Sequence, residues 1–103
     1  MVGDDHAFLR EFAQTFLSDV QAKFPEVERN LKFFNGRMLR DVAHSFAGSA
    51  TCLGADELHK VTVELESAAL SGQLQAAQAA FENFQAELDR VCVFLNKFLE
   101  SNQ

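Results

Sequence analysis

Apolar residues recur every three or four positions along almost the whole chain, and this spacing most constrains the fold. The C-terminal part shows it most regularly, with steps that alternate between three and four residues. Its apolar positions are Leu74, Ala77, Phe81, Phe84, Leu88, Val91, Leu95 and Phe98. Such steps place side chains on one face of an α-helix, whereas a half-buried strand needs strict alternation. The pattern therefore predicts a helical protein.

The same spacing predicts a helix near the N-terminus. It opens at the carboxylates of Asp4 and Asp5, which suit a helix N-terminus. Its apolar stripe comprises Phe8, Leu9, Phe12, Phe16, Leu17 and Val20. Pro25 is expected to stop or kink this helix, so that a short continuation runs to about residue 33. Asn35 and Gly36 then form a turn.

Two more helices are expected before the C-terminal one. The first covers residues 37–52, ends at Gly54 and carries Leu39, Val42, Phe46, Ala50 and Leu53 on one side. The second opens at Asp56 and Glu57 and closes at Ser71 and Gly72, with Leu58, Val61, Leu65 and Ala68 as its stripe. Short connections between amphipathic helices predict an all-α fold: an antiparallel four-helix bundle with an extra short N-terminal helix segment.

The 103 residues suit a single domain that spans residues 1–103. The heptad-like seam of residues 74–98 would also suit a coiled-coil dimer. The other amphipathic helices of the chain can cover this seam, which favours an intramolecular bundle and a monomer. A dimerisation bundle built on the seam remains the alternative.

The net charge of −6 argues against nucleic acid as a partner, because phosphate recognition needs a basic face. No apolar run is long enough to span a bilayer, and the N-terminus lacks the layout of a signal peptide. Cys52 and Cys92 lack metal-ligand spacing and are expected to be reduced thiols in the core. These features predict no membrane association and a cytoplasmic location, or also a nuclear one in a eukaryote.

Most catalytic arrangements are missing from the sequence. No glycine-rich loop is present to hold a nucleotide, and no pair of carboxylates is expected to be buried. The three histidines, His6, His44 and His59, are too far apart in helical phase to form a metal site. We therefore expect no metal, no cofactor and no enzymatic turnover by this chain alone.

His44 differs from the other two histidines in its position on a helix. At 100° per residue, the apolar stripe of this helix clusters within about 60° of Leu39, whereas His44 lies about 140° away. Its neighbours on the outward side are two arginines and three small residues: Arg37, Arg40, Ala47, Gly48 and Thr51. A glycine inside a helix costs about 0.5–1 kcal/mol relative to alanine, so Gly48 suggests a need for close approach by another protein. On spacing alone, a solvated surface histidine remains the alternative.

A basic segment precedes this histidine. Between positions 29 and 40 the chain has four bases and no acid: Arg29, Lys32, Arg37 and Arg40. In an acidic protein such a segment suggests contact with an anionic partner. Phe33 and Phe34 lie within it, either as an apolar anchor for that partner or as caps on the core.

The run from Ala43 to Ala55, AHSFAGSATCLGA, resembles the signature of histidine-containing phosphotransfer (HPt) domains, A-H-x-[LF]-K-G-[SA]-[SA]-x-x-[LIV]-G-A. The resemblance continues through Leu58, Leu65, Glu66, Gly72, Glu87 and Val91. It implies that His44 accepts a phosphoryl group from an aspartyl phosphate on a receiver domain and passes it to another receiver. The partners would be receiver domains of response regulators or hybrid histidine kinases, which would bring the Mg²⁺.

The chain departs from the family pattern at one position. The usual lysine three residues after the histidine, which is thought to attract or steady the phosphoryl group, is Ala47 here. We expect Arg40 to supply a replacement charge, with Arg37 as a weaker candidate. Ala47 also keeps open a second function, a phosphorylation-deficient helical module that docks receiver or kinase domains.

Overall fold

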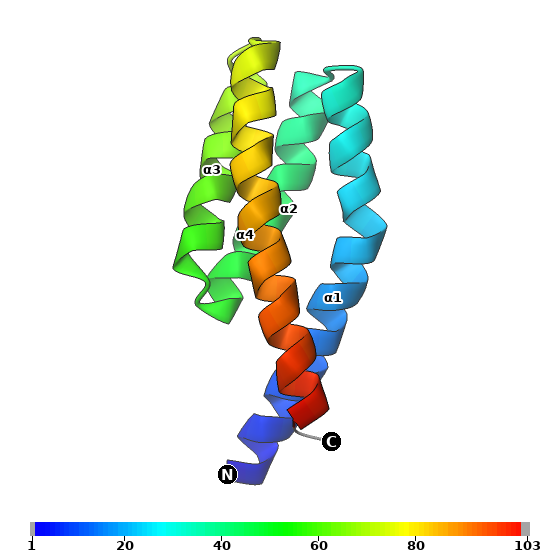
Figure 1. The fold of residues 1–103 in the computed structure, drawn as a ribbon, viewed down its shortest axis with the longest axis vertical. Coiled ribbons are helices and arrows are strands. Elements are labelled where there is room, and N and C mark those ends of the chain that lie inside the picture. Colours follow the sequence, from blue (N-terminus) through cyan, green and yellow to red (C-terminus); the bar gives the residue numbers. More distant parts are fainter. Residues whose placement is uncertain (1, 102–103) are drawn as a thin grey trace.

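The apolar faces of four helices enclose one core. The computed structural model describes the backbone of residues 2–101 and the side chains of residues 7–101. Within them the helices are α1 (Val2–Lys32), α2 (Gly36–Leu53), α3 (Asp56–Leu70) and α4 (Leu74–Ser101), and no strand is present (Figure 1). Connections of two or three residues make neighbouring helices antiparallel. The predicted four-helix bundle is thus confirmed.

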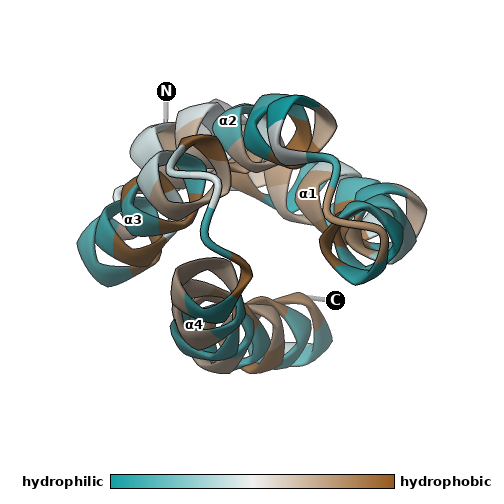
Figure 2. Ribbon diagram, turned by 90° about the horizontal axis from the view of Figure 1, so that it is seen from above, coloured by the Kyte–Doolittle hydropathy of each residue, from teal (hydrophilic) through white to brown (hydrophobic). Residues whose placement is uncertain are grey.

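Seen along its length, the bundle places α2 between α1 and α3, while α4 closes the ring between α3 and α1 (Figure 2). Phe46 of α2 meets Phe84 of α4 edge to face at the centre, with ring centroids 5.3 Å apart. The seam of α4 is used inside this core, because Ala77, Phe84, Leu88 and Leu95 are all buried. Helices of the same chain therefore cover much of the seam that a coiled-coil dimer would need, although Leu74 at its start is exposed.

Pro25 was expected to stop or kink the first helix; the stop was wrong, and the short extra segment is part of α1. The helix continues through Pro25 to Lys32. Proline removes one helix hydrogen bond, a cost of about 3 kcal/mol. Packing on both sides offsets this cost, because Phe24 contacts Phe81 at 5.7 Å between ring centroids and Val27 is fully buried. The side chains of Asp4, Asp5 and His6 lie outside the described residues.

The two phenylalanines in the turn between α1 and α2 lie in different environments. Phe34 adopts a left-handed conformation with φ of 45°, which costs a bulky residue about 1 kcal/mol or more. Its ring is half-buried against the core, whereas Phe33 is 73% exposed. Phe34 therefore caps the core, as one of the two predictions had it, whereas Phe33 does not. The Asn35 side chain accepts a hydrogen bond from the Met38 amide and starts α2.

Both cysteines are free thiols, but only one contacts the core. Cys92 is half-buried, and burial, with a smaller contribution from Asp89, raises the pKa of its thiol. Cys52 is exposed near the end of α2, so its expected place in the core was wrong. Across residues 2–101, no helix combines the length and the apolar character that crossing a bilayer requires.

Two glycines of α2 lie in opposite environments. A Cβ atom at Gly36 would collide with the backbone carbonyl of Ala69 at the end of α3. A Cβ atom at Gly48 would meet no atom within 4 Å. Gly36 thus allows α2 and α3 to approach closely, whereas packing gives no reason for glycine at position 48.

We expect Gly36→Ala to destabilise the fold by about 1–3 kcal/mol, because backbone must move to admit the methyl group. Gly48→Ala serves as the matched substitution and is expected to stabilise it by about 0.5–1 kcal/mol through helix propensity. Urea unfolding followed by circular dichroism measures both changes. Equal effects from the two substitutions would contradict the close approach at Gly36.

Candidate functional site

His44 projects from the solvent side of α2. Its side chain is 66% exposed, while Leu39, Ala43 and Phe46 of the same helix are buried. The helical periodicity thus gave the correct direction for His44. The buried residues of α2 fix the position of the helix, and the His44 ring on its outer face is accessible to an approaching molecule.

Glu66 of α3 orients the imidazole. Its Oε1 lies 2.9 Å from His44 Nδ1, and its side chain is only 15% exposed. An ionised carboxylate only accepts hydrogen bonds, so in a neutral imidazole the proton must be on Nδ1. The lone pair then lies on Nε2, at the far end of the ring. Glu66 is one of the positions that carry the resemblance, but no role was predicted for it from the sequence.

Arg40 joins the same group of side chains from one turn earlier on α2. Its Nε lies 3.9 Å from Glu66 Oε1, and its Nη1 lies 3.1 Å from Asp41 Oδ1. The structure therefore brings His44, Glu66 and Arg40 together. Arg37 is exposed in the first turn of α2, farther from the histidine along the helix.

The three small residues near His44 do not share one environment. Gly48 and Thr51 are exposed, and the Thr51 hydroxyl donates to the Ala47 carbonyl oxygen over 3.1 Å. Ala47 is buried, so its expected place on the open face was wrong. At 100° per residue Ala47 lies about 80° from Leu39, closer to the apolar stripe than His44 is, and helix packing covers this position. Only Gly48 and Thr51 thus leave open surface beyond the histidine.

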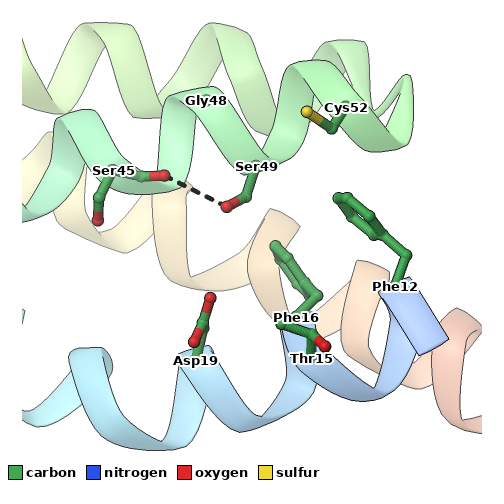
Figure 3. Close-up of a pocket in the computed structure, with 8 residues that line it drawn as sticks. All are labelled: Phe12, Thr15, Phe16, Asp19, Ser45, Gly48, Ser49 and Cys52. Atoms are coloured by element: carbon green, nitrogen blue, oxygen red, sulfur yellow. Dashed lines mark hydrogen bonds between the residues drawn. The ribbon is translucent and has the colours of Figure 1, made fainter.

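A groove of about 410 Å³ between α1 and α2 lies next to this open surface. Ser45, Gly48 and Ser49 form its α2 side, where the Ser49 hydroxyl donates to the Ser45 carbonyl oxygen over 3.3 Å (Figure 3). From α1, the carboxylate of Asp19 and the ring of Phe16 point toward α2 (Figure 3). The exposed face at Gly48 therefore continues into a hollow with both polar and apolar walls.

The remaining candidates for metal or acid–base chemistry lie apart from this site. His59 is exposed on α3. Among the residues whose side chains are described, no cluster of three or more histidines, cysteines or carboxylates has a geometry that could hold a metal ion. The chemistry that the site supports is nucleophilic attack by His44 Nε2, with Glu66 behind the ring and Arg40 nearby as a positive charge.

One comparison with known proteins gives a match. The family model described as "Hpt domain" matches residues 11–93, a range that includes His44, Glu66 and Arg40. Comparisons with curated proteins and with solved structures found no match.

We expect Glu66→Ala to shift the neutral His44 ring from the Nδ1–H form toward the Nε2–H form. Loss of a hydrogen bond of about 1 kcal/mol changes the ratio of the two forms about fivefold. The ¹⁵N chemical shifts of the ring, measured at a pH where it is neutral, report this ratio. Glu64→Ala, which removes an exposed carboxylate from the same helix, is the control. Unchanged ring shifts in Glu66→Ala would show that Glu66 does not set the tautomer.

Proposed function

This chain belongs to the Hpt domain family, whose members transfer phosphoryl groups through histidine in two-component signalling, and we propose that His44 is its phosphoacceptor. In the proposed relay, His44 accepts a phosphoryl group from the aspartyl phosphate of one receiver domain. It then passes the group to an aspartate of another. Such a relay would operate in the cytoplasm, and in the nucleus as well if the organism is a eukaryote.

The single observation that carries this proposal is the contact between His44 Nδ1 and Glu66, which favours a free lone pair on the outward Nε2. In the transfer step Nε2 attacks phosphorus in line, the new N–P bond forms, and the P–O bond to the aspartyl group breaks. The bonding electrons leave with the aspartate carboxylate. The ring gains positive charge, which the Glu66 carboxylate stabilises through the Nδ1–H.

Arg40 is the proposed substitute for the family lysine that is absent at Ala47. Its present contacts with Asp41 and Glu66 involve exposed or partly exposed groups, and such ion pairs contribute only about 0–1 kcal/mol. A phosphoryl group on Nε2 carries more charge than either carboxylate. Arg40 is therefore expected to turn toward it, with Arg37 as a more distant source of positive charge.

The proposed partner provides what this chain lacks. A receiver domain of a response regulator or hybrid histidine kinase would bring its acidic pocket and Mg²⁺ to His44. The acidic rim would meet the basic segment of residues 29–40, and the exposed Phe33 would supply an apolar contact. Gly48, Thr51 and the groove beside them leave room for this approach. In this division of labour the chain carries the phosphoryl group and binds no cofactor of its own.

We expect the protein to gain phosphate when it is incubated with a phosphorylated receiver domain and Mg²⁺. Phosphohistidine is labile in acid and stable in base, so these two treatments identify the product. His44→Gln should abolish the signal, whereas the matched control His59→Gln, also at an exposed histidine, should retain it. Binding of the receiver without any phosphate on the wild-type chain would contradict the relay and favour the phosphorylation-deficient docking module.

Arg40→Ala is expected to slow phosphorylation of His44 about tenfold, because it removes about 1.4 kcal/mol of charge stabilisation near the phosphoryl group. Arg40→Lys should restore most of the rate. Arg90→Ala, at an exposed arginine of α4, is the control for a general loss of charge. Single-turnover transfer from a phosphorylated receiver measures all three. If Arg40→Ala accepts and holds phosphate like the parent, Arg40 does not replace the lysine.

A further inference from the structure

The groove between α1 and α2, here named the Asp19 groove, contains a carboxylate without a partner among the described side chains. Asp19 is half-buried and points across the groove toward α2 (Figure 3). It forms no ion pair or hydrogen bond with any residue whose side chain the structure describes. The hydroxyls of Ser45 and Ser49 on the opposite wall donate to carbonyl oxygens of their own helix instead. No base lines the groove, so the acceptor oxygens of Asp19 are available to a donor from outside.

Gly48 keeps the entrance of this groove open. It lies one turn after His44 on α2, about 6 Å along the helix. A Cβ atom at Gly48 would meet no atom within 4 Å, so packing within the chain does not require a glycine. Because a glycine inside a helix costs about 0.5–1 kcal/mol relative to alanine, the missing side chain favours a role in contact with another molecule. Access to the Asp19 groove from the His44 side is such a role.

The lining of the Asp19 groove fits a lysine or arginine side chain. The volume of about 410 Å³ lies within the range of about 300–1,000 Å³ of small-ligand pockets, so a whole side chain can enter. The rings of Phe12 and Phe16 suit the alkyl stem of such a side chain, and the carboxylate suits its charged end. A purely apolar side chain would cover the carboxylate without giving it a hydrogen bond, and an acidic one would be repelled.

Unpaired charges of opposite sign lie on the two sides of His44. Arg37, about two turns before it on α2, is exposed and forms no ion pair with the described side chains. Arg40 and Asp41, which lie between them, contact each other. The Asp19 groove opens on the other side, one turn after the histidine. Along the helix, Arg37 and the entrance of the groove are about 17 Å apart.

We propose that the Asp19 groove is a second docking contact for the receiver domain and takes a lysine or arginine side chain from it. The inference rests on the proposed function, in which the acidic rim of the receiver meets the basic segment of residues 29–40. A receiver turned end for end would set its base against Arg37 and its acids against Asp19, so both contacts would be repulsive. The two contacts therefore fix the orientation of the receiver. They select receivers that carry an acidic group and a base roughly 17 Å apart.

The affinity for the receiver domain that phosphorylates this chain tests the proposal. Isothermal titration with the unphosphorylated receiver should give a dissociation constant about three- to tenfold higher for Asp19→Asn than for the parent. Asp19→Lys should raise it further, because this variant sets like charges against each other. Glu82→Gln, at an exposed carboxylate of α4, is the matched control and should bind like the parent. Circular dichroism verifies that each variant is folded.

Gly48→Gln tests the same groove without changing its charge. The new side chain enters open space in the free chain, so the fold should be retained. It obstructs the entrance of the groove, and we therefore expect weaker binding of the receiver. Gly48→Ala, a smaller obstruction, should weaken binding less. Unchanged affinity in Gly48→Gln would overturn the proposal.

A charge exchange identifies the residue of the receiver that enters the groove. The bases on the docking face of the receiver are replaced by glutamate one at a time. One of these receiver variants should lose affinity for the parent chain and recover it with Asp19→Lys. The proposal is overturned if no receiver variant recovers, or if Asp19→Lys binds the unaltered receiver as the parent does.

The outcomes separate this inference from the relay. Phosphate on His44 together with unchanged affinity in Asp19→Lys would overturn the inference and leave the relay intact. Receiver binding that depends on Asp19 but yields no phosphate would overturn the relay and support the docking contact. A parent chain that neither binds the receiver nor gains phosphate would overturn both.

Discussion

The geometry of the site depends on the hydrogen bond between His44 Nδ1 and Glu66. It joins an exposed ring on α2 to a largely shielded carboxylate on α3. Because the carboxylate takes the inner nitrogen, the outer nitrogen keeps its lone pair and faces solvent. One contact thereby determines the orientation of the ring, the proton position and, in the proposed relay, the direction from which a phosphoryl group arrives.

The bundle makes this contact possible by fixing the rotation of α2 against α3. Phe46 and Leu39 anchor the inner face of α2, and Leu65 anchors α3 directly beside Glu66 in sequence. Gly36 lets the start of α2 come close to the end of α3. The residues that build the core and those that form the site therefore lie on different faces of the same two helices.

The periodicity of the sequence predicted the helices and the outward direction of His44, because both follow from local spacing. Predictions from this periodicity were wrong where packing between helices determines the structure. Pro25 lies inside α1 since contacts of Phe24 and Val27 offset the lost hydrogen bond. Ala47 is buried although it was expected among the outward neighbours of His44. The role of Glu66 was not predicted, because a contact between helices depends on their relative rotation.

The most direct test of the proposed role of His44 is to determine which of its two ring nitrogens becomes phosphorylated. ³¹P and ¹⁵N NMR of the phosphorylated chain, prepared with a phosphorylated receiver, distinguish the two ring nitrogens of His44. We expect the phosphoryl group on Nε2, with the proton on Nδ1 toward Glu66. Phosphate on Nδ1, or on a residue other than His44, would contradict it.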